Sequence, residues 1–404
     1  MEGVRVLEVA QYTFTPAAGA VLADWGADVI KVEHAVTGDA QRGIKLGTGG
    51  VAAGSFQPLM EHPNRGKRSI GLALDTDRGR ALLDELIRDS DVFLTNFLPS
   101  ARTKLRIDVD DVRAVNPAII YARGSAFGPR GPEATSGGYD LSSFWCRGGS
   151  AFGATPEGSR LMAGQPSGAY GDSLGGMTIA GGISAALFHR QRTGEPSVVD
   201  VSLLSMATWA TALSIGNALL VGEDAPRAHI DGPAHTPVNP LVGTFRTSDD
   251  RFINFTMLQP GRYWPEVCRF LGRDDLIADE RFDTAEKLMA NAIEAGRYVE
   301  EAFAQHSYAH WCDRLRTLEG QWAPVQSPLE VAADPQVRAN GYIVGVIDAE
   351  GNRRELVASP VQFDETPAQI TRAPAFAEHT DEIVTALGRT VDELIQLKID
   401  GAVT

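Results

Sequence analysis

One carboxylate set among glycines is the residue of this chain best suited to covalent chemistry. Asp172 lies in the run 171–176 (Gly-Asp-Ser-Leu-Gly-Gly), after a loop rich in Gly and Pro and before a long apolar segment. That segment ends at 189–194 (His-Arg-Gln-Arg-Thr-Gly), and basic residues followed by glycine are typical of a helix C-terminus. Asp172 is therefore predicted at or near the N-terminus of a helix, where the dipole favours negative charge.

Two interpretations of Asp172 are open on this pattern. Aspartate is a common N-cap, which would make Asp172 a structural residue. Aspartate is also a covalent nucleophile. For the second role, the helix terminus would keep the carboxylate ionised, and the flanking glycines would leave room for a bulky electrophile.

Length and composition narrow the class of protein. A chain of 404 residues, 43% hydrophobic and 22% charged, is ordinary for a soluble globular protein of two or three domains. The formal charge of −15 argues against nucleic acid or an anionic membrane surface as a partner. The N-terminus lacks a basic segment followed by an apolar one, and no apolar run is long enough to span a bilayer. With three scattered cysteines in addition, we expect a cytoplasmic protein without a membrane segment.

Several familiar sites are missing from the pattern. The chain has no Gly-x-Gly-x-x-Gly fingerprint, no Walker loop and no Gly-x-Ser-x-Gly elbow. His306 and His310 are four residues apart, but no third ligand accompanies them. We therefore predict neither a metal site nor a permanently bound cofactor.

The first part of the chain alternates between strand and helix patterns. Short apolar runs rich in β-branched residues predict strands at 4–9, 28–32, 69–74, 91–97 and 118–122, with helices at 16–25, 77–88 and 108–115 between them. This order predicts an α/β fold with a doubly wound parallel sheet. Ligands of such sheets bind outside the carboxyl ends of the strands, which directs attention to the loops after Val9, Val32 and Asn96.

Three segments are expected along the chain. Residues 1–224 form the N-terminal part of a large domain, and 225–325 form a smaller α+β domain that begins where prolines become frequent. Residues 326–404 are expected to return to the large domain.

Two basic clusters lie near predicted strand ends. One is Lys67 with Arg68, and the other comprises Arg102, Lys104 and Arg106. Arg102 and Arg106 are four residues apart and would share a helix face. Such clusters either clamp phosphates or form a solvated face, and the spacing leaves both interpretations open.

The chain resembles the family III CoA-transferases, the group of the carnitine and formyl-CoA transferases, over nearly its whole length. The passages that carry the resemblance are GVRVLEVA (3–10), ADWGADVIKVE (23–33) with Gly38 and Asp39, NRGKRSI (64–70), DVFLTNF (91–97), GDS (171–173), RTGEP (192–196) and WAPVQ (322–326). The resemblance implies a large Rossmann-like domain with a smaller domain, and an interlocked homodimer.

The resemblance also implies a mechanism. The aspartate matching Asp172 would attack the thioester of an acyl-CoA donor, giving a mixed anhydride and then an aspartyl-CoA thioester. A carboxylic acid acceptor would then take over the CoA. Acyl-CoA and a carboxylic acid are thus the implied substrates, and glycine N–H groups near Asp172 would stabilise the thioester oxyanion.

By the same matching, the CoA contacts fall on residues of several loops. They are Gln11, Tyr12, Thr13, Pro16, His34, Lys67, Arg68, Asn96, Phe97 and Lys104, with Arg102 sharing the load of Lys104 and Tyr139 shaping the site together with Asn96. Two positions depart from the family, which often has arginine where this chain has His34 and Lys104. Histidine is a weaker partner for phosphate at neutral pH, and lysine lacks the bidentate fork.

Two other functions are compatible with the same fold. The related 2-methylacyl-CoA racemases exchange an α-proton by means of a histidine in a Gly-His-Asp sequence. Here the matching stretch is Gly-Tyr-Asp at 138–140, and an unperturbed phenol is a poor base at neutral pH. A non-catalytic CoA-binding subunit is the other alternative. The presence of Asp172 argues against it, because an inactive subunit need not keep its nucleophile.

Overall fold

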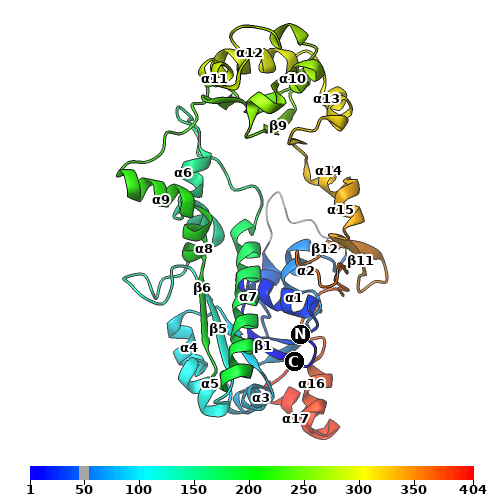
Figure 1. Cartoon of the computed structure of the whole chain (residues 1–404). Helices are drawn as coiled ribbons and strands as arrows, with labels where there is room; N and C mark the ends of the chain where they lie inside the picture. Colours follow the sequence, from blue (N-terminus) through cyan, green and yellow to red (C-terminus); the bar gives the residue numbers. More distant parts are fainter. Residues whose placement is uncertain (45–53) are drawn as a thin grey trace. The chain divides into compact units, whose positions relative to one another are not determined.

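Figure 1 shows the computed structural model, which describes residues 1–44 and 54–404. The chain divides into two compact units. The first comprises residues 1–155, 161–225 and 335–404, and the second comprises residues 156–160 and 226–334.

The first unit is built on a six-stranded sheet in the order β3-β2-β1-β4-β5-β6, and every neighbouring pair is parallel. Its strands are β1 (Arg5–Val9), β2 (Asp28–His34), β3 (Arg68–Leu72), β4 (Val92–Thr95), β5 (Ile120–Ser125) and β6 (Val198–Ser202). The predicted α/β class and parallel sheet are confirmed. The strand order reverses between β1 and β4, where the loops at the carboxyl ends separate and leave room for a ligand.

Side chains alternate between the two faces of the sheet, and each face has its own apolar core. Val6 and Leu94 belong to the core on one face, whereas Leu7 and Phe93 belong to the other. The helices of the first face are α1 (Phe14–Asp24), α7 (Tyr170–Thr193) and α8 (Leu203–Ala210), with the π-helix η2 (Asp140–Cys146). Those of the second face are α3 (Asp77–Arg88), α5 (Val109–Val115), α16 (Thr380–Ala386) and α17 (Val391–Ile399).

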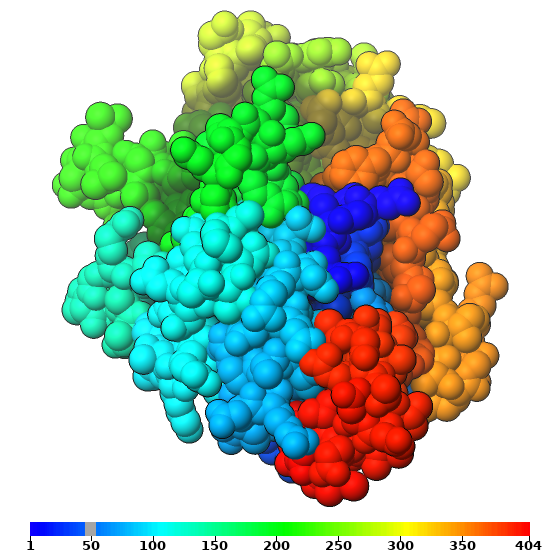
Figure 2. Space-filling view, turned by 90° about the horizontal axis from the view of Figure 1, so that it is seen from below, coloured from blue at the N-terminus to red at the C-terminus, as the bar shows by residue number. Residues whose placement is uncertain are grey.

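The end of the chain completes the second face. Thr404 donates from its backbone N–H to the carbonyl of Gly71 at 3.2 Å, so the terminus continues the edge of the sheet beside β3. Arg389 forms an ion pair with Glu85 of α3, and Figure 2 shows the C-terminal segment side by side with the segment that carries α3. Residues far apart in sequence therefore build one core.

The remaining elements of the first unit are short. They are α2 (Pro58–Asn64), α4 (Pro99–Leu105), α6 (Ser150–Ala154), α9 (Ala212–Val221), α15 (Pro335–Ala339), the strands β11 (Ile343–Ile347) and β12 (Arg353–Val357), and the 3₁₀ turn η1 (Ala40–Gly43). Among the described helices, none is by itself long and apolar enough to cross a membrane. By length and composition only, α8 and α9 pass that test as a pair, bent by 69°.

The second unit has an antiparallel sheet in the order β10-β9-β8-β7, packed on helices. Its strands are β7 (His235–Thr236), β8 (Asn239–Arg246), β9 (Phe252–Thr256) and β10 (Trp322–Pro324); its helices are α10 (Pro260–Leu271), α11 (Ala285–Ala290), α12 (Ala292–Phe303), α13 (Tyr308–Arg314) and α14 (Pro328–Ala333), with the 3₁₀ turns η3 (Asp274–Leu276) and η4 (Leu315–Thr317). This unit runs to Asp334, beyond the expected residue 325, because Arg251 holds α14 through Glu330 at 2.8 Å.

Candidate active site

Asp172 lies in the first turn of α7, as predicted, but it is not the N-cap. The N-cap is Ala169, whose backbone has a left-handed φ of 58° and whose side chain offers no capping group. The helix ends at Gly194, which has a φ of 79°, as the sequence indicates. The cap interpretation of Asp172 is therefore wrong.

The cap is supplied by a residue to which the sequence assigned no role. The buried side chain of Asp140, at the start of η2, accepts a hydrogen bond from the N–H of Gly171 through Oδ1 at 3.0 Å. Its Oδ2 accepts from Nε2 of Gln165 at 3.1 Å. A carboxylate 31 residues earlier in the chain thus satisfies a free N–H at the start of α7.

Asp140 lies close enough to Asp172 to affect its ionisation. Burial, with a smaller contribution from the nearby charge of Asp140, raises the pKa of Asp172 to about 7. Burial also raises the pKa of Asp140, partly offset by the hydrogen bonds from Gly171 and Gln165. Burial therefore works against the ionisation of Asp172 that a position at a helix terminus favours.

The glycines around Asp172 serve packing. A methyl group added to Gly171 would overlap the ring of Phe144, and one added to Gly175 would overlap Phe14. Gly176 is similarly closed by Ala17 of α1. These positions are glycine because α7 lies very close to η2 and α1, not because an electrophile needs room. The N–H of Gly171 is occupied by Asp140, so it is not available to an oxyanion.

His62 of α2 is a second residue to which the sequence pattern assigned no role. Its Nε2 lies 2.9 Å from Oγ of Ser173, which itself donates to the carbonyl of Ala169 at 2.8 Å. The hydroxyl proton is thus engaged, so Nε2 of His62 is the donor. Burial and Arg65 lower the pKa of His62 to about 4, which leaves the ring neutral as a link between α2 and α7.

A pocket of about 260 Å³ opens at the carboxyl ends of β1 to β4. Four of the predicted CoA contacts line it together, namely Gln11, His34, Phe97 and Lys104. The other lining residues are Val9, Val32, Glu33, Leu72, Leu74, Asp75 and Leu105. The pocket lies where a parallel sheet of this strand order is expected to receive its ligand.

The polar side chains His34 and Lys104 of this pocket have few hydrogen-bond or ion-pair partners of their own. Nδ1 of His34 accepts from the N–H groups of Val36 and Thr37, each at 3.2 Å, so the neutral ring carries its proton on Nε2. The exposed Lys104 forms no ion pair with any residue that the structure describes. His34 and Lys104 therefore remain available as donors to an anion.

Two contacts connect the pocket to the start of α7. Asn96 donates from Nδ2 to the carbonyl of Gln11 at 2.6 Å and accepts from its N–H at 3.0 Å, which joins the loops after β1 and β4. The ring of Tyr12 packs edge-on against that of Tyr139, with centroids 5.6 Å apart. Because Tyr139 directly precedes Asp140, which accepts from the N–H of Gly171, this contact links the loop after β1 to the start of α7.

Lys67 lies elsewhere. Its side chain is fully buried, and Nζ donates to Glu8 at 2.7 and 2.9 Å, to the carbonyl of Pro16 at 2.8 Å and to Oδ1 of Asn64 at 3.2 Å. Pro16 is buried in α1. Thr13 is also buried, with its hydroxyl on Gln41 at 2.9 Å. An ammonium with this many internal partners is not free to bind a phosphate, so the assignment of Lys67 to CoA is corrected.

Arg68 and Arg102 are committed to carboxylates as well. Arg68 starts β3 and bonds Asp28 at the start of β2, so it lies at the amino edge of the parallel sheet, opposite the pocket. Arg102 is buried, donating to Asp108 at 3.2 Å and to the carbonyl of Phe97 at 2.8 Å. The expected shared face with Arg106 does not form, because Arg106 ends α4 in a left-handed conformation.

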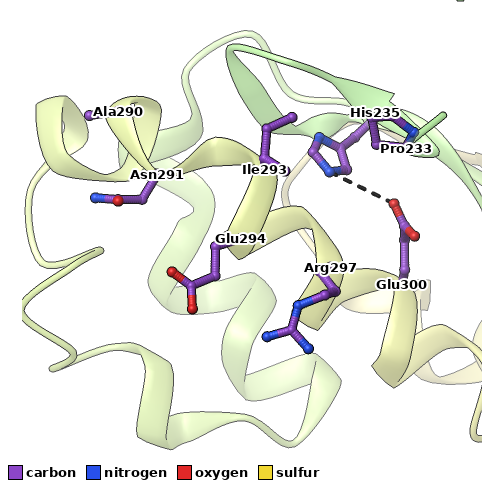
Figure 3. Close-up of a pocket in the computed structure, with 8 residues that line it drawn as sticks. All are labelled: Pro233, His235, Ala290, Asn291, Ile293, Glu294, Arg297 and Glu300. Atoms are coloured by element: carbon purple, nitrogen blue, oxygen red, sulfur yellow. Dashed lines mark ion pairs between the residues drawn. The ribbon is translucent and has the colours of Figure 1, made fainter.

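The second unit has a cavity of its own, of about 620 Å³, beside α12. Figure 3 shows His235 and Glu300 pointing toward one another in it, with Nε2 and Oε1 3.7 Å apart. None of the residues predicted to bind CoA lines this cavity. The chemistry expected of this chain is therefore concentrated in the first unit.

Comparisons with known proteins identify the family of this chain. Residues 1–380 match the model of CoA-transferase family III. The chain is 29% identical to a cinnamoyl-CoA:phenyllactate CoA-transferase of Clostridium sporogenes, covering 98% of this chain and 96% of that protein. It is 30% identical to a succinate–glutarate CoA-transferase of Agrobacterium fabrum, covering 96% of this chain and 95% of that protein.

A solved structure supports the same assignment. A CAIB/BAIF family protein from Brucella suis superposes with a TM-score of 0.81 at 29% identity, covering 96% of this chain and 98% of that one. The relatives named here are transferases, and none of their names supports a racemase. The chain belongs to CoA-transferase family III, and its enzyme class is that of a CoA-transferase.

Proposed function

We propose that this protein transfers CoA from an acyl-CoA to a carboxylic acid, with Asp172 as the covalent nucleophile. The observation that carries the proposal is the position of Asp172, half-buried beside Asp140 at the start of α7, in a chain of this family. Shielding from water makes a carboxylate a better nucleophile, because less hydration must be removed before it attacks.

The first half of the reaction removes CoA from the donor. An oxygen of the Asp172 carboxylate forms a bond to the thioester carbon, the carbon–sulfur bond breaks, and CoA leaves as the thiolate. The thiolate then attacks the aspartyl carbonyl of the mixed anhydride. The donor leaves as its carboxylate, and Asp172 carries CoA as a thioester.

The second half repeats these steps with the acceptor. Its carboxylate attacks the aspartyl thioester and releases the thiolate, which then attacks the acceptor's carbonyl carbon in the new anhydride. This forms the product thioester and restores the Asp172 carboxylate. The cycle consumes no proton, so a site without a strong general base is sufficient.

The nucleotide end of CoA is assigned to the pocket at the carboxyl edge of the sheet, in the manner of a Rossmann-like fold. Lys104 and Nε2 of His34 would bind phosphate oxygens, and Gln11 and Phe97 would line the base or ribose. The pantetheine arm would pass Tyr12 and Tyr139 on its way to Asp172. Asn96 would hold the loop of Gln11 in place.

Trapping of the covalent intermediate tests the proposal. The purified chain is incubated with a panel of acyl-CoAs chosen from the relatives' names, including cinnamoyl-CoA, succinyl-CoA and formyl-CoA, and is treated with hydroxylamine. Mass spectrometry of the tryptic peptide Leu161–Arg190 is expected to show a hydroxamate on Asp172. The Asp172→Asn variant, which keeps the shape of the side chain, is expected to show none.

Other outcomes contradict the proposal. Deuterium uptake at the α-carbon of a 2-methylacyl-CoA, without any hydroxamate, would indicate the racemase. CoA binding without covalent adduct or turnover across the panel would indicate a non-catalytic subunit.

The same proposal includes a homodimer. No residue of α9 is buried, and Trp209, Leu219 and Leu220 are 83%, 81% and 87% exposed. Apolar groups this exposed on adjacent helices are typical of a protein interface, and a second copy of the chain is the partner expected from the family resemblance. Light scattering is expected to give twice the chain mass, and Leu219→Glu with Leu220→Glu is expected to shift it to the monomer. A wild-type monomer would contradict this part.

A further inference from the structure

The pocket at the carboxyl edge contains a carboxylate, Asp75, that has no ion-pair partner among the described residues. Asp75 is exposed in the turn between β3 and α3, and it forms neither an ion pair nor a side-chain hydrogen bond within residues 1–44 and 54–404. A free carboxylate is unexpected in a pocket that receives a polyanion such as CoA, because like charges repel.

The other acidic residue of the pocket is in a different state. Glu33 is buried and accepts from Arg42 through both oxygens at 2.7 Å, from Oγ of Ser69 at 2.7 Å and from the N–H of Asp39 at 2.9 Å. Burial alone would raise its pKa, but these partners lower it. Glu33 is therefore part of the frame of the pocket, and Asp75 is the acidic side chain left to face a ligand.

The neighbours of Asp75 suggest which part of the ligand it meets. Leu72 and Leu74, from the same turn, line the pocket together with the ring of Phe97 and the side chain of Leu105. Apolar walls of this kind suit a flat purine ring better than a hydrated phosphate. Lys104, whose ammonium has no ion-pair partner among the residues that the structure describes, comes from α4 and not from the turn of Asp75.

The structure of CoA limits which hydrogen-bond donor can face Asp75. Its nucleotide has two kinds of neutral hydrogen-bond donor, the 6-amino group of adenine and the ribose 2′-hydroxyl. The 2′-hydroxyl is adjacent to the 3′-phosphate, so a carboxylate placed there would face a second anion. The 6-amino group lies at the end of the base that is remote from the phosphates.

We propose that Asp75 accepts a hydrogen bond from the 6-amino group of the adenine of CoA and makes the pocket selective for that base. This inference rests on the proposed function, since it requires the CoA nucleotide to bind at the carboxyl edge. Asp75 is thus a specificity residue, remote from the reacting atoms.

The test compares CoA with its hypoxanthine analogue, in which a carbonyl oxygen replaces the 6-amino group. Calorimetry on the wild-type protein is expected to give a Kd about tenfold higher for the analogue, the factor that one hydrogen bond to a charged group provides. Asp75→Ala is expected to bind CoA about tenfold more weakly and to bind both ligands equally, since the carboxylate no longer distinguishes them.

Two further variants serve as controls. Asp75→Asn keeps an oxygen acceptor for the 6-amino group but adds an amide donor for the carbonyl oxygen of the analogue, so it is expected to bind CoA better than Asp75→Ala does while showing a smaller preference than the wild-type protein. Asp77→Ala, two residues along, removes the same charge from an exposed position outside the pocket and is expected to leave the preference unchanged.

Three results would overturn the inference. Equal binding of CoA and its analogue to the wild-type protein removes it while leaving the transferase proposal intact. If Asp75→Ala instead changes the preference between CoA and 3′-dephospho-CoA, the carboxylate faces the ribose phosphate. If CoA itself does not bind and no hydroxamate forms on Asp172, the proposed function fails as well.

Discussion

Two groups of charged side chains lie inside the first unit, and they are built in opposite ways. Around Glu8, cations and anions alternate: Lys31 and Lys67 both contact its carboxylate, at 3.2 and 2.7 Å, and Lys31 also reaches Asp39 at 2.8 Å. At the start of α7, Asp140 and Asp172 lie close together, and the described part of the chain provides no ion pair to either.

The difference shows which buried charges stabilise the fold and which are available for chemistry. A buried carboxylate that is matched by ammonium groups and further hydrogen bonds has no capacity left for a ligand, even though burial lowers the pKa of the Lys67 ammonium to about 7. A pair of carboxylates without a cation is costly to ionise, so the pKa rises into the range where small changes alter the charge. Such perturbed groups are concentrated at functional sites.

The largest expected effect comes from breaking the matched group. Lys67→Met should destabilise the protein by about 3–5 kcal/mol, because it leaves Glu8 with one cation fewer and removes the donor to Pro16 and Asn64. Urea unfolding with a spectroscopic probe measures this. Lys104→Met is the matched control: it should change stability by less than about 0.5 kcal/mol and raise the Kd for CoA about fivefold. A fully stable Lys67→Met protein with weakened CoA binding would restore the assignment of Lys67 to the ligand.

These two lysines also show how far the sequence can be interpreted. Both stand in short basic runs near strand ends, and the sequence alone gives them the same role. The structure separates them because burial depends on which residues from other elements surround a side chain: Lys67 meets Glu8 of β1, which is 59 residues earlier, whereas Lys104 meets solvent. Local patterns do not contain that information.

Features that depend on residues adjacent in the sequence were predicted well. Strands β1 to β5 follow from short β-branched runs, and α7 follows from an apolar run that ends in basic residues and Gly194. The apolar segment from Leu203 to Val221 is broken at Thr211 into two helices, α8 and α9. The role of Asp140 was missed because its partner, Gly171, is 31 residues away and the connection exists only in the folded chain.

The smallest expected effect concerns the carboxylates of Asp140 and Asp172, and it tests how this pair differs from the group around Glu8. Asp140→Asn removes the charge beside Asp172 but keeps an oxygen that accepts from the N–H of Gly171, and Gln165 can rotate its amide to complete the new contact. The pKa of Asp172, about 7 in the native chain, should fall. Since attack requires the ionised form, the acidic limb of the pH profile of kcat/KM should move to lower pH, with a donor identified by trapping.

The stability of the same variant gives an independent measurement. In the native chain the folded-state pKa of Asp172, about 7, lies above the usual carboxyl value of about 3.9, so ionisation costs stability as the pH rises through that window. Asp140→Asn should reduce this loss of stability. Urea unfolding at about pH 4 and about pH 7, the two ends of the window, measures the difference. Asp140→Ala removes the same charge together with the acceptor for Gly171, so it should move the acidic limb similarly but lower the stability. If neither variant moves the limb, burial alone sets the pKa of Asp172, and the pairing of the two carboxylates is not what distinguishes this region from the group around Glu8.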